Sequence, residues 1–447
     1  MRKIHLIGGG GVGMSSLGLY LLHRGYTVSA SDQEETKYLK LLKNAGAQVW
    51  VGHDPKKIPQ DAFVYYSSAI SVDNPERLFC EQKGIPCLSR HHLLEMITQE
   101  CYTIAVAGTH GKTTTTAWIG SLLEDLGYDP TVIVGGSLSR WQGNFRGGRG
   151  LYDKKPLLVL EADESDGSFL YLDYRIAVLT NTDWDHPDRF PTRQDVEHEY
   201  LTFLKKNPQA IIVCSLESQD FFRKHKLRLP ASLEKISIKE SHGRSQLFYE
   251  NNEIPISLPG KHNLYNASAV LACLLHFSSA EKIIPRMSFF TGVERRLQKI
   301  GVLSLPQGVI DIIDDYAHHP SELRASYKAL QDNYHQVLLA WEPHRLSRLS
   351  LFGQDFLHFF EEENILPQVV LLPLYTAGEK EVDYPQSKKI LERIKQKIPH
   401  HLDFFSAARL YDYALQILTK FPAAILFAGA GKSQQYAYEF LNFMSER

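Results

Sequence analysis

The stretch Val106-Ala-Gly-Thr-His-Gly-Lys-Thr-Thr-Thr-Thr116 decides the fold that we expect for this chain. Residues 104–107 predict a buried strand and residues 114–126 predict a helix, with a glycine loop between them. Backbone N–H groups of such a loop, together with the N-terminus of the helix, form a concave site for phosphate. The lysine can reach the terminal phosphates of a nucleotide, and a hydroxyl after it can hold Mg²⁺. The stretch therefore predicts a nucleoside-triphosphate site, with a ligand-free strand–turn–helix as the alternative. The residues that we expect at this site are Gly108, Thr109, His110, Gly111, Lys112, Thr113 and Thr114.

A second glycine turn lies at the start of the chain. Gly8, Gly10 and Gly13 fit the spacing G-x-G-x-x-G between an apolar strand and an apolar helix, and Asp32 ends the next predicted strand. This arrangement places a diphosphate at a helix N-terminus and an acid near a ribose hydroxyl. Alone it suggests a nicotinamide-dinucleotide oxidoreductase, or a turn that binds nothing. Because an oxidoreductase needs only this turn and a simple ATP switch only the other, both together suggest an enzyme that uses ATP on a diphosphate-bearing substrate.

Two predicted core strands of the central region end in acidic residues. Residues 157–160 lead into Glu161-Ala-Asp163-Glu164-Ser-Asp166, and residues 176–179 lead into a segment that contains Asp185-His186. Carboxylates this close repel one another unless a cation is present, and Mg²⁺ prefers oxygen ligands. We expect the two strands to be neighbours and their ends to hold a metal ion. A solvated acidic turn is the alternative.

Two further central segments have less definite signals. The glycine- and arginine-rich segment 140–150 lacks periodicity, so we expect a mobile loop or one that closes over a ligand. Residues 259–277 predict a helix with His262, Asn263 and Asn266 in its first turns. Amides there can hold a nucleotide base or simply cap the helix.

Strands and helices alternate again after residue 293. Predicted strands cover residues 309–314, 335–341, 369–372 and 423–428, and three polar clusters follow strand ends. We expect Arg345 and Arg348 to share one face of a helix start and to grip a carboxylate, with solvated surface arginines as the alternative. The clusters are Asp314-Asp-Tyr-Ala-His-His-Pro320, Glu342-Pro-His-Arg-Leu-Ser-Arg348 and Tyr375-Thr-Ala-Gly-Glu379. A glycine turn, Ala428-Gly-Ala-Gly431, either accepts an anion or only turns the chain.

Composition limits the class of protein. The chain has 447 residues, 43% hydrophobic and 22% charged, with a net charge of −2 and five scattered cysteines. These values predict two to four domains in a reducing, cytoplasmic compartment, with no nucleic-acid partner and no membrane partner. The alternation of predicted strands and helices along the chain predicts the α/β class. We expect domain boundaries at 1–101, 102–293 and 294–447, and a monomer or weak homodimer.

Taken in order, these motifs resemble those of the Mur ligases, the ATP-dependent amide-forming family of bacterial cell-wall synthesis. The resemblance covers the whole chain and rests on five groups of residues: Gly108–Thr116, Glu161–Leu170, Thr180-Asn181 with Asp185-His186, His262-Asn263 with Asn266, and Arg295-Arg296 with Asp315–Pro320. It implies an N-terminal Rossmann-like domain for a UDP-linked substrate, a central P-loop ATPase-like domain and a C-terminal Rossmann-like domain for an amino acid. Within the family, the acidic string and Pro343-His344-Arg345 most resemble the branch that joins L-alanine to UDP-N-acetylmuramate. The branch that adds a preformed tripeptide is the nearest alternative.

The resemblance also implies roles for single residues. Lys112 would hold the β- and γ-phosphates of ATP, and Thr113, Glu161 and His186 would hold Mg²⁺. The other implied sites are Asn263, Arg296 and Tyr316 for the nucleotide, Gly8, Gly10, Gly13, Asp32 and Ser68 for the UDP substrate, and His318, His344, Arg345 and Arg348 for the amino-acid side. Residues 183–190 and 428–432 depart from the family pattern.

Overall fold

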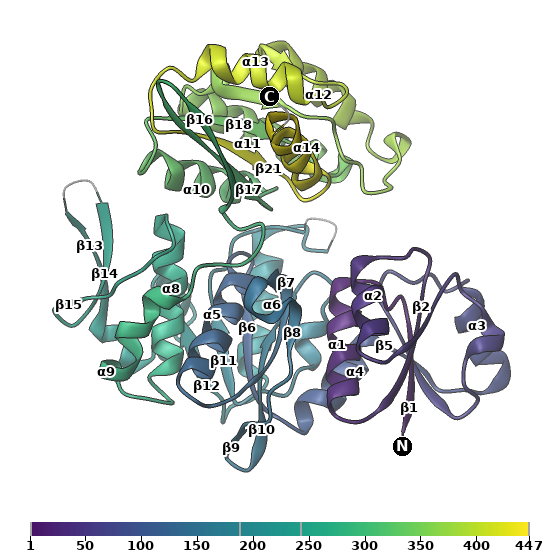
Figure 1. Cartoon of the computed structure of the whole chain (residues 1–447). Coiled ribbons are helices and arrows are strands. Elements are labelled where there is room, and N and C mark those ends of the chain that lie inside the picture. The colour runs from purple at the N-terminus through teal and green to yellow at the C-terminus, as the bar shows by residue number, and fades with distance from the viewer. Residues whose placement is uncertain (1, 187–188, 242–243, 446–447) are drawn as a thin grey trace. The chain divides into compact units, whose positions relative to one another are not determined.

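Helices and strands alternate throughout this computed structural model, which describes residues 2–186, 189–241 and 244–445 (Figure 1). The α/β class predicted from the sequence is confirmed. The described chain divides into two compact units. Of the described residues, the first comprises 2–186, 189–241, 245–257 and 264–293, and the second comprises 244, 258–263 and 294–445. The three domain boundaries expected from the sequence stay a prediction.

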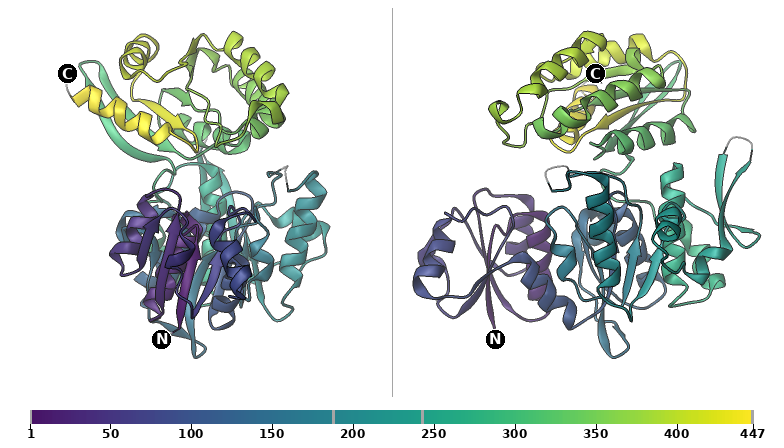
Figure 2. Two further views of the ribbon diagram at one scale, coloured as in Figure 1. Left: turned by 90° about the vertical axis from the view of Figure 1, so that its right-hand side faces the viewer. Right: turned by 180° about the vertical axis from the view of Figure 1, so that it is seen from behind.

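The N-terminal sheet of the first unit carries the first glycine turn. Its strands are all parallel and follow the order β3-β2-β1-β4-β5. Helices cover both of its faces in the two orientations of Figure 2. The bounds are β1 Lys3–Ile7, α1 Val12–His23, β2 Thr27–Asp32, α2 Lys37–Asn44, β3 Gln48–Val51, β4 Ala62–Tyr66, α3 Pro75–Lys83, β5 Cys87–Ser89 and α4 Arg90–Gln99. The strand order reverses beside β1, so the crevice of the sheet opens where β1 meets the glycine turn.

The second sheet carries the phosphate loop, and its strand order is β12-β11-β6-β10-β7-β8. Strand β6 (Tyr102–Ala107) pairs in parallel with β10 (Lys155–Glu161) on one side and with β11 (Ile176–Leu179) on the other. The expectation that β10 and β11 are neighbours was therefore wrong, because β6 lies between them. Their carboxyl ends still meet at one edge of the sheet, on either side of the phosphate loop. The remaining strands are β7 Thr131–Leu138, β8 Gly143–Arg146, β9 Leu151–Tyr152 and β12 Ile211–Cys214.

The arginine-rich segment 140–150 is ordered by pairing and charge. Strand β8 runs antiparallel to β7. Arg146 forms ion pairs with Glu124 at 3.1 Å and with Asp129 at 2.7 Å. Residues 143–146 thus form a strand where we expected a loop, and the ion pairs of Arg146 hold this strand on the sheet. The expected mobility of the segment stays a prediction.

Helices and a small separate sheet complete the central part of the chain. The helices are α5 Lys112–Asp125, α6 Arg193–Lys205, α7 Gln219–Lys224, α8 Lys261–Leu274 and α9 Ala280–Ile283. The small sheet consists of β13 Ile236–Ser241, β14 Arg244–Tyr249 and β15 Asn252–Glu253. Helix α5 begins at Lys112, two residues before the start that the sequence predicted.

The second unit is built on a six-stranded sheet with the order β16-β17-β21-β18-β19-β20. Only β16 is antiparallel to its neighbour in this sheet. The strands are β16 Gln298–Leu305, β17 Gly308–Asp315, β18 Gln336–Trp341, β19 Val369–Leu371, β20 His400–His401 and β21 Ala423–Ala428. The helices are α10 Pro320–Gln331, α11 Leu346–Glu362, α12 Pro385–Lys397, α13 Ala407–Ile417 and α14 Ser433–Ser445. Apolar residues of α13 and α14 pack on one face of the sheet in a continuous core.

Within the part of the chain that the structure describes, no helix combines the length and the apolar character needed to cross a bilayer.

Candidate active site

The phosphate loop between β6 and α5 has a backbone that only glycine accommodates. Gly108 and Gly111 adopt φ values of +133° and +78°. A Cβ atom on Gly108 would lie 2.0 Å from Thr180 Oγ1, and one on Gly111 would lie 2.3 Å from Asn266 Oδ1. Both distances are far below van der Waals contact, so the loop needs glycine at these positions for conformation and for space.

The end of β11 fixes the loop from the side. Thr180 Oγ1 and Asn181 Nδ2 both donate to the carbonyl of His110, at 2.6 and 2.9 Å. Asn181 Oδ1 accepts the N–H of His110 at 3.1 Å. Thr109 Oγ1 donates to the carbonyl of Asp183 at 2.6 Å. The residues Thr109 and His110, predicted to bind the nucleotide, thus lie in a loop with a fixed shape.

Lys112, at the start of α5, lies against a buried carboxylate. Its Nζ is 2.8 Å from Glu164 Oε2 and donates to the carbonyl of Thr109 at 3.0 Å. Burial raises the pKa of Glu164 to about 7, although the ammonium group of Lys112 works in the opposite direction. Burial also opposes the charge on Lys112, but the carboxylates around it, Glu164 foremost, outweigh burial and raise its pKa. Glu164 belongs to the acidic string after β10 but is not among the site residues predicted from the sequence.

Thr113 and Glu161 form the second pair at this edge of the sheet. Thr113 Oγ1 donates to Glu161 Oε1 at 2.9 Å, and the N–H of Gly135 donates to Glu161 Oε2 at 2.6 Å. Burial raises the pKa of Glu161, which means that its negative charge is poorly solvated. A hydroxyl and a carboxylate side by side are the oxygen ligands that Mg²⁺ prefers. These two residues therefore fit the predicted metal site.

His186 lies with a different group of residues. Its Nε2 is 3.9 Å from Glu164 Oε1 and 4.0 Å from Asp185 Oδ2. The structure thus places it beside the Lys112–Glu164 pair, whereas the sequence grouped it with Thr113 and Glu161. Its φ of 53° is in the left-handed region, at a segment that departs from the family pattern. Pro187 and Asp188 of that segment lie outside the described residues.

The first glycine turn is held by the end of β2. The N–H groups of Gly8 and Gly9 both donate to the carbonyl of Ser31 at 2.9 Å. Asp32 Oδ2 accepts the N–H of Gly10 at 2.8 Å. We expect Asp32 to meet a ribose hydroxyl, and in the structure its carboxylate accepts a hydrogen bond from the backbone of the glycine turn. This contact could not be read from the spacing of the motif.

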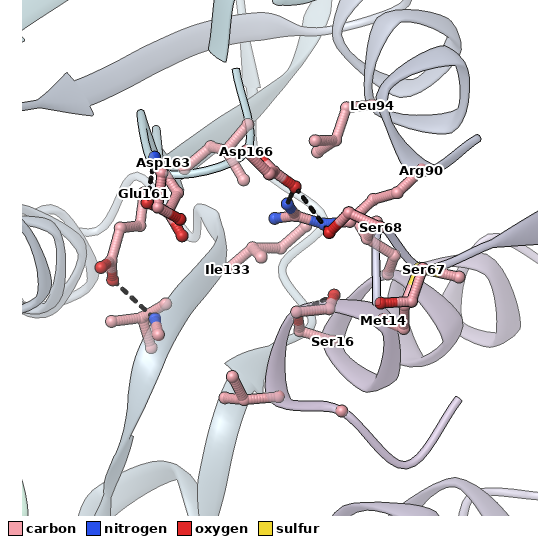
Figure 3. Close-up of a pocket in the computed structure, with 18 residues that line it drawn as sticks. Met14, Ser16, Ser67, Ser68, Arg90, Leu94, Ile133, Glu161, Asp163 and Asp166 are labelled. Atoms are coloured by element: carbon pink, nitrogen blue, oxygen red, sulfur yellow. Dashed lines mark hydrogen bonds and ion pairs between the residues drawn. The ribbon is translucent and has the colours of Figure 1, made fainter. Parts of the chain in front are cut away.

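Gly13 at this turn and the acidic strand end Glu161 line the same cavity, which has a volume of about 260 Å³ (Figure 3). Its lining comes from the start of α1, the turn after β4, α4 and the segment after β10. Figure 3 shows Arg90 beside Asp166 and Ser68. Arg90 Nη1 donates to Asp166 Oδ2 at 2.7 Å, and Ser68 Oγ donates to the same oxygen at 3.3 Å. Ser68 was predicted for the UDP substrate, whereas Arg90 was missed.

Asn263 and Asn266 of α8 have different surroundings. Asn263 Nδ2 donates to the carbonyl of Pro259 at 2.7 Å. Asn266, by contrast, has its Oδ1 atom 2.3 Å from the point where a Cβ atom on Gly111 would lie. We predicted Asn263 for the adenine, but Asn266 is the residue placed against the phosphate loop.

In the second unit, two arginines before β16 and the residues after β17 form a cationic and aromatic cluster. The guanidinium carbons of Arg295 and Arg296 lie 4.9 and 5.4 Å from the centre of the Tyr316 ring. His318 Nδ1 is 3.3 Å from Glu322 Oε2. Arg296, Tyr316 and His318, all predicted as site residues, are thus brought together.

His344, Arg345 and Arg348 follow β18. Burial, with the charges of Arg348 and Arg345, lowers the pKa of His344 to about 4, so its imidazole is neutral at pH 7. Arg345 is the residue before α11 and has φ 64° and ψ 138°, whereas Arg348 is inside the helix and buried. The expectation that both arginines share a helical face was therefore wrong. A left-handed residue at the helix boundary points its side chain in a direction that helical periodicity does not predict.

Family models of known proteins match most of the chain. The model for the Mur ligase family, catalytic domain, matches residues 3–102, and the model for the Mur ligase middle domain matches residues 106–274. The chain belongs to the Mur ligase family. Relatives extend the similarity over the remaining residues, since the UDP-N-acetylmuramate–L-alanine ligase of Persephonella marina is 32% identical over 100% of this chain and 98% of that protein.

Other Mur ligases give the same picture. The UDP-N-acetylmuramate–L-alanine ligase of Carboxydothermus hydrogenoformans is 35% identical over 99% of this chain and 96% of that protein. The crystal structure of UDP-N-acetylmuramate–alanine ligase MurC from Thermotoga maritima superposes with a TM-score of 0.76 at 25% identity, over 100% of both chains. A murein peptide ligase from Psychrobacter arcticus shares the fold, with a TM-score of 0.68 at 19% identity.

Proposed function

We propose that this Mur ligase joins L-alanine to the carboxylate of UDP-N-acetylmuramate in an ATP-dependent, ADP-forming reaction of peptidoglycan precursor synthesis. One observation carries the proposal: the first glycine turn and Glu161 line the same cavity. The carboxylate of Glu161 also accepts a hydrogen bond from Thr113, which connects this cavity with the phosphate loop. A diphosphate-tagged substrate at Gly13 would then reach toward the ATP site. The names of relatives that are 32% and 35% identical support the same substrates.

The chemistry explains why ATP is needed. A carboxylate does not react with an amine at neutral pH because oxide is too poor a leaving group. Transfer of the γ-phosphoryl group to a carboxylate oxygen gives an acyl phosphate and ADP. The amine then attacks the acyl carbon, the C–N bond forms, and phosphate leaves with the former carboxylate oxygen. Catalysis of such transfers depends mainly on positioning and on stabilisation of negative charge.

Lys112 would supply most of that stabilisation from the protein. Its ammonium group already faces a carboxylate, that of Glu164, at 2.8 Å. A γ-phosphate in the loop would replace Glu164 as the partner of Lys112. With a pKa of about 7, Glu164 can take up a proton when it loses this partner, which limits the cost of the exchange.

Thr113 and Glu161 would hold Mg²⁺, as their oxygen atoms fit this ion. A bound Mg²⁺ neutralises charge on the phosphates during transfer. His186 would lie beside Glu164 and close to the phosphoryl group that is transferred. We assign Asn266 rather than Asn263 to the nucleotide, because Asn266 is the one that lies against Gly111.

In the second unit, His344, Arg345 and Arg348 would receive the amino acid. The pKa of His344, about 4, makes its imidazole a weak base, so it is suited to hydrogen bonding rather than to proton removal at pH 7. The cytoplasmic location and the monomeric or weakly dimeric state remain predictions.

The function is tested by phosphate release from ATP with UDP-N-acetylmuramate and a series of amines: L-alanine, L-serine, glycine and an L-alanyl tripeptide. We expect release that requires both the UDP-sugar and an amine, with the highest kcat/KM for L-alanine. A preference for the tripeptide would assign the chain to the recycling branch. Absence of release with every amine would refute the ligase function, and hydride transfer to a nicotinamide cofactor would favour the oxidoreductase alternative.

A further inference from the structure

The segment Tyr375–Glu379, one of the three polar clusters of the sequence, folds back on the predicted amino-acid site. The N–H of Arg345 donates to the carbonyl of Tyr375 at 2.8 Å, and the N–H of Tyr375 donates to the carbonyl of Pro343 at 2.9 Å. The ring of Tyr375 stacks on that of His344, with centroids 5.6 Å apart and planes 14° from parallel. The segment is thus paired with the residues that lead into α11.

Glu379 ends this segment and binds Arg345 and the start of α11. Its Oε1 accepts Arg345 Nε at 2.7 Å and Ser347 Oγ at 2.7 Å, and its Oε2 accepts the N–H of Ser347 at 3.0 Å. The N-terminus of a helix and a guanidinium group both favour an anion, so this carboxylate is held by charge-assisted bonds. Burial acts to raise the pKa of Glu379, but Ser347 and Arg345 outweigh it and lower the pKa, which keeps the carboxylate ionised.

Arg345 needs such a partner because of its backbone. A left-handed conformation at a non-glycine residue is strained and persists only where the surroundings impose it. Its side chain is 38% exposed, against 11% for Glu379. Glu379 therefore engages Arg345 at Nε, and this contact leaves the two Nη groups of the more exposed arginine side chain for a ligand.

We propose that Glu379 is a positioning residue of the amino-acid site, which holds Arg345 so that its terminal amino groups face the carboxylate of the incoming amino acid. This inference rests on the proposed function. If Glu379 only capped the N-terminus of α11, it would have the same contacts, but its replacement would change the stability of the protein alone. The two roles differ in their effect on the KM for the amino acid.

The test compares Glu379→Gln and Glu379→Ala with wild type, with KM and kcat measured for the amine substrate, ATP and the UDP-sugar. The loss of a charge-assisted bond predicts that Glu379→Ala raises the KM for the amino acid by about tenfold or more. KM for ATP and for the UDP-sugar should change by less than about twofold. Glu379→Gln keeps one acceptor oxygen for Arg345 and Ser347, so it should recover much of the lost affinity.

Glu362→Gln is the matched control. Glu362, the last residue of α11, pairs with Arg324 at 2.6 Å on the surface, with 44% of its side chain exposed. Its loss should leave every KM unchanged. If wild type turns over but the KM for the amino acid is unchanged or lowered in both Glu379 variants, the positioning role is refuted and the ligase function stands. If wild type turns over no amine at all, the proposed function fails and this inference fails with it.

Discussion

Lys112 has an anionic partner within the chain, because Glu164 Oε2 lies 2.8 Å from its ammonium group. A buried ion pair is stable only while both partners are present, since removal of one leaves an uncompensated charge. This arrangement keeps the ammonium group oriented toward the loop. A phosphate group that enters the loop can replace Glu164 without loss of charge compensation for the lysine.

Lys112→Ala tests this residue directly. The variant lacks the cation that would stabilise the transferring phosphoryl group, so we expect kcat for phosphate release to fall by about 10³-fold. Glu164→Gln keeps Lys112 and its loop, and should retain far more activity than Lys112→Ala. Near-normal turnover in Lys112→Ala would contradict the assigned role, provided that its circular dichroism spectrum matches that of wild type.

His344 predicts a dependence of stability on pH. Its pKa is about 4 in the folded chain, whereas an unfolded histidine titrates near ~6.5. Between these values the unfolded chain binds a proton that the folded chain does not, so this contribution is present above pH ~6.5 and is lost as the pH falls toward 4. The melting temperature of wild type relative to His344→Gln should therefore decrease from pH 7 to pH 4.5. A difference that stays constant over this range would show that His344 is not buried in the neutral form.

Among the elements, the loop between β6 and α5 depends most on glycine. Gly111→Ala would place a Cβ at 2.3 Å from Asn266 Oδ1 in a backbone with φ +78°. We expect the displaced loop to lower kcat/KM for ATP by about 10²-fold. Gly127→Ala, at the other end of α5, is the control, because it has φ +86° but no atom within 4 Å of its Cβ position. It should cost about 1 kcal/mol of stability and leave kcat/KM unchanged. Equal effects of the two substitutions on kcat/KM would contradict the contact with Asn266.

Most strands were predictable because their signal is local. Apolar runs such as residues 176–179 form a strand with the expected bounds, Ile176–Leu179. Elements that depend on distant partners were not predictable. Strand β8 is stabilised by β7 and by the ion pairs of Arg146, and the pairing of β16 with β17 has no signature in composition. Tertiary pairing, rather than local propensity, decides these elements.

The candidate site likewise contains features that the sequence predicts and features that depend on tertiary contacts. The phosphate loop and the Thr113–Glu161 pair follow from motif spacing and from the rule that parallel strands end at one edge. The hydrogen bonds that the predicted binding residues form with other residues of the chain do not follow from motif spacing. Asp32 binds Gly10, and Glu379 binds Arg345. Glu342 accepts the N–H groups of Gly431 and Lys432 at 2.8 and 2.6 Å, so the glycine turn after β21 does receive an anion, but one from the chain itself.

At the scale of the whole molecule, the predicted phosphate and metal sites lie in one unit, and the predicted amino-acid site lies in the other. The two glycine turns and the acidic strand ends lie in the first unit, and His344 and Arg345 lie in the second. A dinucleotide enzyme would leave the phosphate loop without a role, and a simple ATPase would leave the first glycine turn without one. The ligase function would use both turns, together with His344, Arg345 and Arg348.

The transfer of oxygen from substrate to phosphate tests the central claim most directly. UDP-N-acetylmuramate labelled with heavy oxygen in its carboxylate is incubated with ATP, Mg²⁺, L-alanine and the full chain, and the released phosphate is analysed by mass spectrometry. Attack of the amine on an acyl phosphate predicts one heavy oxygen atom in each phosphate that is released with an amide product. Unlabelled phosphate accompanied by amide formation would contradict activation of the carboxylate by the γ-phosphoryl group.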